Sequence, residues 1–170
     1  DIIKLAAARE LVNGIKINTD KKILEDFQKS AGFDYTKDQK RSIKEIFADL
    51  SSGRVMDRLL SGDVGFGKTE VAMNAMLAVI LDGFQAIFVC PTTLLATQHY
   101  HSMQKRFSEF GISIAKLDGK TSAKEKTHIK KGLESGEIKL VIGTHSLLEI
   151  KTNNLALVII DEEHKFGVKQ

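Results

Sequence analysis

The 170-residue sequence has no tryptophan, one proline and one cysteine, and it lacks an apolar run of the ~18 to 20 residues that a membrane-crossing helix needs. We therefore exclude a membrane-spanning protein, and the 28% charged and 42% hydrophobic residues exclude a disordered one. The lone Cys90 cannot form a disulfide within the chain, which favours a reducing, cytoplasmic setting. Because it ends an apolar run, we expect a small buried thiol. The first residues show no signal-peptide pattern.

Charge of one sign is also scarce. The 25 Lys and Arg residues against 22 Asp and Glu give a formal net charge of +3, which is compatible with a nucleic-acid partner and too small to imply one. A local basic cluster either faces solvent or lies against DNA, and it comprises Lys116, Lys120, Lys124, Lys126, Lys130 and Lys131.

Apolar periodicity predicts N-terminal helices over residues 2–12 and 21–31. The capping-box spacing of Thr36 and Gln39 then predicts a helix that ends before Gly53. From Met56 onward, short continuous apolar runs alternate with helical segments, as in βαβ units. We predict strands over 56–60, 86–90, 112–117, 140–142 and 157–160, and helices over 68–81, 93–110 and 122–134. The expected fold is α/β, a mainly parallel sheet with helices on both faces.

A glycine-rich segment lies between a predicted strand and a predicted helix. It reads Gly62-Asp63-Val64-Gly65-Phe66-Gly67-Lys68-Thr69 and fits the P-loop pattern G-x-x-x-x-G-K-[ST]. Backbone N–H groups and the helix N-terminus would bind phosphate oxygens, Lys68 would reach the β- and γ-phosphates, and the Thr69 hydroxyl would face Mg²⁺. The alternative is a glycine-rich turn without a ligand. Phosphate chemistry does not explain Phe66, which we assign to packing.

Acidic residues follow the last predicted strand, where ligands collect in open α/β sheets. Asp161 suits a Mg²⁺ ligand, and Glu162 suits the base that orients and deprotonates an attacking water. Taken alone, such acids are also typical of a solvated loop. Together with the P-loop they indicate a nucleotide site that uses Mg²⁺.

The motifs resemble those of the first RecA-like domain of superfamily 2 helicases and translocases. The tetrad Asp161-Glu162-x-His164 accompanies the P-loop, while Phe33 and Gln39 resemble the adenine-reading Q motif. Two further segments resemble motifs Ia and Ic, and they are Pro91-Thr92-Thr93-Leu94-Leu95-Ala96 and Gly143-Thr144-His145.

More narrowly, the segments 56–70 and 161–168 are similar to those of the bacterial transcription-repair coupling factors. The related RecG family usually has Ser, Glu and Gln at positions that are Phe66, Thr93 and Glu163 in this sequence. These three positions favour the coupling factors. The alternative within the superfamily is a RecG-like branched-DNA helicase.

This resemblance implies an ATP-dependent translocase on double-stranded DNA that displaces stalled RNA polymerase in transcription-coupled repair. RNA polymerase and repair proteins would bind other parts of the protein. The implied catalytic residues are Lys68, Asp161, Glu162 and His164, and the implied Mg²⁺ ligands are Thr69 and Asp161. The implied nucleotide-binding residues are Phe33, Gln39, Gly62, Asp63, Val64, Gly65, Phe66, Gly67, Lys68, Thr69 and Glu70. The implied DNA contacts are Pro91, Thr92, Thr93, Gly143, Thr144 and His145.

Several of these residues have a structural alternative. Gln39 also occupies the N3 position of the capping box. The threonines of motifs Ia and Ic suit helix caps and turns equally well. His99 and His101 are two apart on a predicted helix, do not share a face and lack a metal-ligand set, so we assign them to structure or surface.

The sequence also departs from the family. Motif III, which follows the Asp-Glu-x-His strand and lies between it and the P-loop strand, is missing, as is the second RecA-like lobe with its arginine finger. We therefore expect an incomplete domain, with residues 1–32 as a helical connection and 33–170 as the first RecA-like domain. Without its central strand, the sheet would expose apolar surface and leave backbone groups unpaired.

Two other functions compete with the motor. A nucleotide-binding interaction module could dispense with the water-activating Glu162, so the presence of this residue favours an enzyme. A small-molecule P-loop kinase would have no use for the Asp-Glu-x-His tetrad.

Overall fold

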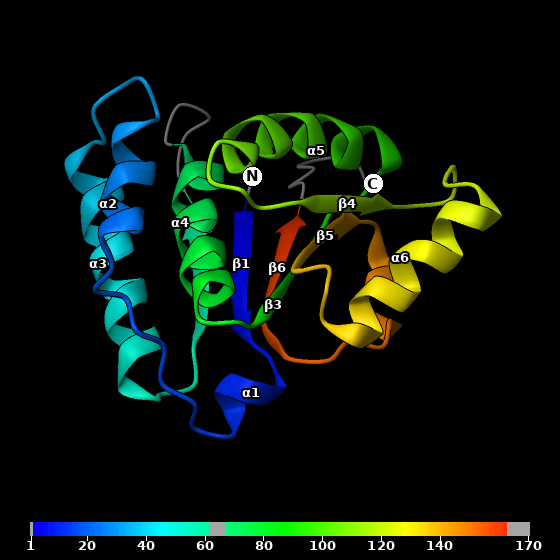
Figure 1. The fold of residues 1–170 in the computed structure, drawn as a ribbon. Coiled ribbons are helices and arrows are strands. Elements are labelled where there is room, and N and C mark those ends of the chain that lie inside the picture. The colour runs from blue at the N-terminus through cyan, green and yellow to red at the C-terminus, as the bar shows by residue number, and fades with distance from the viewer. Residues whose placement is uncertain (1, 62–66, 163–170) are drawn as a thin grey trace, which may run out of the picture.

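The computed structural model describes residues 2–61 and 67–162 (Figure 1). One six-stranded sheet has the order β2-β1-β6-β3-β5-β4. The strands are β1 (Ile2–Ala7), β2 (Asp57–Ser61), β3 (Gln85–Val89), β4 (Ile114–Leu117), β5 (Leu140–Gly143) and β6 (Leu155–Glu162). The helices are α1 (Arg9–Val12), α2 (Lys22–Lys29), α3 (Lys37–Ser52), α4 (Lys68–Leu81), α5 (Thr93–Ser108) and α6 (Ala123–Ser135), with the 3₁₀-helix η2 (His145–Glu149).

The sheet is mainly parallel, as predicted. Strands β4, β5, β3 and β6 pair in parallel, and both β2 and β6 run antiparallel to β1, so β2 shares the common direction. The predicted helices after residue 36 and the strands after Met56 are all present, with shifts of a few residues at their ends. The P-loop helix has the predicted bounds, Lys68–Leu81.

Apolar side chains cover both faces of the sheet, which confirms the predicted layers. On β3, Phe88 joins the larger core under α4 and α5, while Ile87 and Val89 join a smaller core under α6 and η2. In Figure 1, α2, α3 and α4 stand together on one side and α6 lies apart from them. No helix in the described ranges has the length and apolar character needed to cross a membrane.

The N-terminal segment differs from the prediction of a helix over 2–12. Residues 2–7 form β1, and only Arg9–Val12 is helical. Ile3 and Leu5 are buried. The strand pairs with β2 on one edge, where Ile2 lies opposite Ser61, and with β6 on the other, where Ala7 lies opposite Leu157. Two ladders of hydrogen bonds outweigh the helical preference of the alanine-rich stretch, because propensity is a weak prior beside tertiary packing.

The expected gap in the sheet is therefore not found. Strand β1 lies between the P-loop strand β2 and the acidic strand β6, where we expected unpaired backbone groups. The division of the chain at residue 32 stays a prediction, although β1, from the first part, belongs to the same sheet as the rest.

Candidate nucleotide-binding site

The P-loop strand β2 and the acidic strand β6 end at the same edge of the sheet, with β1 between them. Ser61, the last residue of β2, and Glu162, the last of β6, both lie opposite Ile2 of the strand between them. Two strand spacings separate the two ends by ~10 Å. The carboxyl ends of these strands thus meet at the edge of the sheet where open α/β folds bind ligands.

Helix α4 begins at this edge. Its N-cap Gly67 has φ 74°, a left-handed conformation that favours glycine, and Lys68 and Thr69 form the first turn. Lys68 is buried and Thr69 is partly buried. The positive end of the helix dipole at such an N-terminus suits an anion. Residues 62–66 of the predicted P-loop, Gly62 to Phe66, lie outside the described residues.

Gln39 connects the start of α3 to the end of the P-loop. Its side chain accepts from the Thr36 N–H while Thr36 Oγ1 accepts from the Gln39 N–H, which confirms the capping box. The Gln39 amide Nε2 also donates to the Gly67 carbonyl over 3.4 Å. A Cβ at Gly67 would meet the end of this flexible side chain, which would have to shift, whereas the positive φ of Gly67 by itself favours glycine. Adenine recognition by Gln39 stays a prediction.

An open cavity of about 680 Å³ is lined by α2, the loop after it and the start of α3. Phe33, 53% exposed, and Tyr35 line it with their rings 5.8 Å apart, and Lys40 and Glu25 contribute charges. An exposed aromatic ring beside the P-loop helix can pack against a nucleobase. This geometry is compatible with the predicted role of Phe33.

Asp161 and Glu162 differ sharply in environment. Asp161 is 5% exposed and its Oδ2 lies 2.9 Å from His99 Nε2, whereas its Oδ1 is buried without a hydrogen-bond partner among the described residues. Glu162 is exposed at the strand end. Burial raises the pKa of the nearby Cys90 thiol to about 12, and the charge of Asp161 adds to the shift, so Cys90 stays protonated. The predicted catalytic His164 lies outside the described residues.

The unpaired oxygen Oδ1 of Asp161 suits a Mg²⁺ ligand. A buried carboxylate oxygen without a donor suits a hydrated cation, and Mg²⁺ in nucleotide sites is usually held by one or two protein oxygens together with phosphates. Asp161 and the Thr69 hydroxyl are such oxygens, so the residues present fit the ion. The described residues contain no cluster of three or more His, Cys, Asp or Glu side chains that could hold a metal.

The two segments that resemble motifs Ia and Ic also meet. Pro91, Thr92 and Thr93 follow β3. Gly143 ends the adjacent parallel strand β5, Thr144 and His145 follow it, and the Cys90 N–H donates to the Gly143 carbonyl over 2.7 Å. Thr92 is exposed and caps α5 by accepting from the Leu95 N–H. Thr144 makes no side-chain cap, and His145 is exposed.

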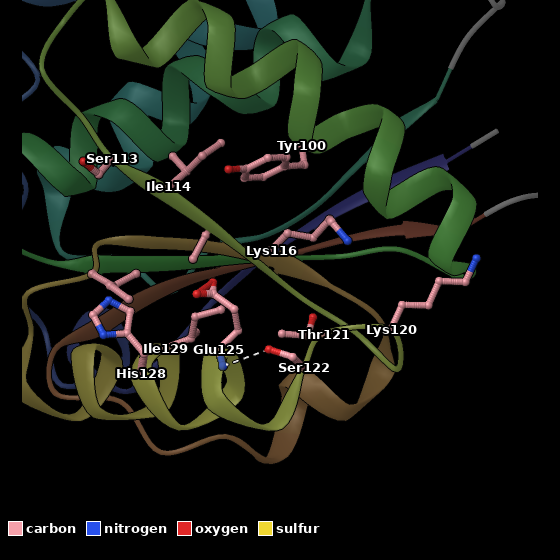
Figure 2. Close-up of a pocket in the computed structure, with 12 residues that line it drawn as sticks. Tyr100, Ser113, Ile114, Lys116, Lys120, Thr121, Ser122, Glu125, His128 and Ile129 are labelled. Atoms are coloured by element: carbon pink, nitrogen blue, oxygen red, sulfur yellow. Dashed lines mark hydrogen bonds between the residues drawn. The ribbon is translucent and has the colours of Figure 1, made fainter.

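A second cleft, of about 560 Å³, lies along the edge strand β4 between α5 and α6 (Figure 2). It receives two members of the basic cluster, Lys116 and Lys120, but Lys116 bonds to Asp118 at 2.9 Å and Lys120 extends away from the other labelled side chains. Glu125 and His128 line the opposite wall. Its mixed charge lends no support to DNA binding in this cleft.

Helix α5 adds a contact at this edge that the sequence analysis does not predict. His99, which we assign to structure or surface, lies with its Nε2 2.9 Å from Asp161 Oδ2. The signal was present in the helical period, because His99 lies three residues after Ala96 and four before Met103, both fully buried. The spacing between His99 and His101 does not by itself show that His99 faces inward.

Comparisons with known proteins agree with this geometry. The sequence model of the DEAD/DEAH box helicase family matches residues 36–170. The transcription-repair-coupling factor of Helicobacter pylori strain J99 is 54% identical over 169 residues, which cover 99% of this chain and 17% of that protein. The ATP-dependent DNA helicase RecG of Thermotoga maritima is 48% identical over 169 residues, which cover 98% of this chain and 22% of that protein.

A solved structure of RecG bound to a three-way DNA junction superimposes with a TM-score of 0.83 at 48% identity, covering 90% of this chain and 21% of that one. The chain thus spans about a fifth of the length of these relatives. Because the family model covers well over half of the chain, the protein belongs to the DEAD/DEAH box helicases.

Proposed function

We propose that this chain is the first lobe of an ATP-hydrolysing motor that translocates on double-stranded DNA and displaces stalled RNA polymerase in transcription-coupled repair. The observation that carries the proposal is the meeting of three features at one edge of the sheet. These are the start of α4, the buried Asp161 and the exposed Glu162. Such a set binds a nucleotide and also holds the groups that hydrolysis needs.

Each residue has a distinct task at this edge. The first turn of α4 and the Lys68 ammonium bind the phosphates and neutralise their charge. Mg²⁺, when bound, neutralises charge that develops on the transferred phosphoryl group, and Asp161 Oδ1 and the Thr69 hydroxyl would hold it. Glu162, at the exposed end of β6, accepts the proton of the attacking water.

The Thr92 and Thr144 loops would contact DNA phosphates. Helix capping and phosphate binding are compatible at Thr92, because the cap uses a lone pair of the hydroxyl and leaves its hydrogen to donate. Phosphate contacts carry no sequence information, so binding should be salt-sensitive and should show little sequence preference.

Two observations bear on the type of motor. The identity of 54% to a transcription-repair-coupling factor exceeds the 48% to RecG, which favours the coupling-factor role. A RecG-like helicase on branched DNA is the second candidate, supported by the structural likeness to RecG on a junction. Release of a stalled polymerase by the full-length protein would support the first, and selective unwinding of three-way junctions would support the second.

The decisive measurement is ATP turnover by the full-length protein that carries this chain, with and without duplex DNA. We expect DNA to stimulate turnover. Lys68→Ala should weaken nucleotide binding in a fluorescent-nucleotide titration. Glu162→Gln should keep nucleotide binding and lower turnover by about 10² to 10⁴-fold, because the amide cannot accept a proton.

Several outcomes would contradict the proposal. Unchanged nucleotide affinity in Lys68→Ala would remove the P-loop assignment, and wild-type turnover in Glu162→Gln would show that another group is the base. Nucleotide binding by the unaltered protein without turnover on any DNA would favour the interaction module instead.

A further inference from the structure

Among the described residues, His99 of α5 forms a hydrogen bond with the Asp161 side chain. Helix α5 passes the end of β6 at which Asp161 lies (Figure 1), and His99 Nε2 is 2.9 Å from Asp161 Oδ2. The exposed fractions of the two side chains are 19% and 7%. Water therefore competes weakly for this hydrogen bond, and Oδ1 of the same carboxylate has no hydrogen-bond partner in the ranges 2–61 and 67–162.

The His99 ring is itself held in place. It packs on Phe88 of β3 with ring centroids 5.0 Å apart, and Phe88 is fully buried. Strand β3 pairs with β6 in parallel, with Val89 opposite Ile160. The imidazole is thus fixed between a rigid strand and its own helix, directly beside the carboxylate.

The two carboxylate oxygens of Asp161 lie in different environments. A carboxylate accepts hydrogen bonds only, so Nε2 must carry the hydrogen that bonds Oδ2. This bond fixes the rotation of the carboxylate plane and leaves Oδ1 buried and unpaired. A buried polar oxygen without a partner is costly unless another group binds it, and a ligating carboxylate is usually held by a hydrogen bond of this kind.

We propose that His99 is a positioning residue that orients Asp161 so that Oδ1 faces the Mg²⁺ of the bound nucleotide. This inference rests on the proposed ATP site. It assigns to α5 a task that the nucleotide motifs do not include.

Three substitutions at His99 separate positioning from simple packing. The amide of His99→Gln can place a donor near the position of Nε2, whereas His99→Asn is too short and His99→Leu fills the space without a donor. His101 on the same helix is exposed and touches Tyr100 instead, so His101→Leu is the matched control.

The test measures the Mg²⁺ concentration that gives half-maximal binding of a fluorescent ATP analogue to the full-length protein. We expect His99→Leu and His99→Asn to raise it by about 10- to 100-fold, the range found when residues behind a metal ligand are removed. His99→Gln and His101→Leu should stay close to the unaltered protein. An unchanged value for His99→Leu, or a Gln variant as impaired as the Leu variant, would overturn the proposal.

A second measurement needs neither nucleotide nor metal and remains valid if a variant fails to fold. Nitrogen-15 NMR of the unaltered protein should show the His99 hydrogen on Nε2, and a hydrogen on Nδ1 alone would overturn the proposal. A protein that binds no nucleotide at any Mg²⁺ concentration would refute the proposed function itself. Normal Mg²⁺-dependent binding with an unaffected His99→Leu would refute only the role of His99.

Discussion

Glu70 and Arg106 form a buried ion pair that joins the P-loop helix α4 to α5. Arg106 Nη1 donates to Glu70 Oε1 over 2.5 Å, its Nη2 donates to the Phe27 carbonyl, and its guanidinium lies 4.2 Å from the centre of the Phe27 ring. The Tyr35 hydroxyl donates to the other Glu70 oxygen, and burial, together with this bond, raises the pKa of Tyr35. These contacts connect four parts of the chain, which are helices α2, α4 and α5 and the loop that precedes α3.

Removing Arg106 should destabilise the fold strongly, because Glu70 would then be a buried carboxylate without its cation. We expect Arg106→Met to lower the free energy of unfolding by about 3 to 5 kcal/mol in urea denaturation. Arg41→Met is the control, since Arg41 bonds to Asp38 with both side chains more than half exposed and should cost at most about 1 kcal/mol. Equal decreases in the free energy of unfolding for the two variants would show that the pair of Glu70 and Arg106 stabilises the fold no more than an exposed pair does.

Residues of the candidate site could be proposed from the sequence wherever a short motif is typical of the chemistry. Lys68, Thr69, Asp161 and Glu162 follow from local patterns that require no knowledge of the fold, and β2, which precedes the P-loop, ends at the same edge of the sheet as β6. His99 and Arg106 could not be predicted, because their partners lie 62 and 36 residues away along the chain. Only the packing of α5 decides which of its polar residues face inward.

At the scale of the elements, β1 provides the clearest test of the fold. Along this strand, Ile3 and Leu5 are buried while Lys4 points to the partly exposed face, with Asp57 3.9 Å away. We expect Ile3→Ala to lower the free energy of unfolding by about 2 to 5 kcal/mol and Lys4→Ala to change it by at most about 1 kcal/mol. Amide hydrogen exchange should show slow exchange across residues 3–6. Fast exchange there, with a small effect of Ile3→Ala, would contradict a central strand.

Asp82, the C-cap of α4, holds the segment before α2. Lys21 Nζ lies 2.5 Å from Asp82 Oδ1, and the Asn18 N–H donates to Oδ2. Burial alone would raise the pKa of Asp82, but these bonds outweigh it and leave the pKa below the ordinary value of 3.8. A lowered folded-state pKa means that the stabilisation is complete above pH 3.8 and is lost as the pH falls through the folded-state value.

Asp82→Asn should therefore be less stable than the unaltered protein near neutral pH, by about 1 to 2 kcal/mol. The difference should shrink steadily below pH 3.8, because protonation then weakens the same bonds in the unaltered protein. Urea unfolding at several pH values measures both proteins. A difference that stays constant into the acid range would show that the Asp82 charge does not contribute.

Continuous apolar strands and capped helices explain why most elements could be predicted. The Thr36 box sets the start of α3, and the uninterrupted apolar run around Phe88 indicates a strand buried on both faces. Residues 2–7 could not be assigned in this way. Their alanines fit a helix, and only the space between β2 and β6 makes them a strand.

In the whole molecule, the proposed nucleotide contacts and the proposed DNA contacts lie at the ends of neighbouring strands. The proposed nucleotide-binding residues lie at the start of α4 and the end of β6, and the proposed DNA loops follow β3 and β5. Thr92 caps helix α5 in one of these loops, and His99 of the same helix contacts Asp161. One helix therefore extends from a proposed DNA loop to the proposed Mg²⁺ ligand.

The activity of the isolated 170-residue chain depends on which catalytic groups it contains. Phosphoryl transfer depends mostly on positioning and charge stabilisation, and an arginine finger accounts for about 10³ to 10⁵ in rate where it has been measured. None of the arginines of the chain lies in a segment that resembles a finger motif, and they are Arg9, Arg41, Arg54, Arg58 and Arg106. Arg58 and Arg106 already pair with acids in the fold.

We therefore expect the isolated chain to be nearly inactive as an ATPase, even where it binds nucleotide, and to be unaffected by duplex DNA. The comparison is between this chain and the full-length protein that carries it, each with and without duplex DNA at saturating ATP and Mg²⁺. Circular dichroism should first establish that the isolated chain is folded, so that inactivity reflects missing groups rather than lost structure. DNA-stimulated turnover by the chain at the full-length rate would show that this lobe alone supplies the catalytic charge, and the two-lobed motor would then be wrong.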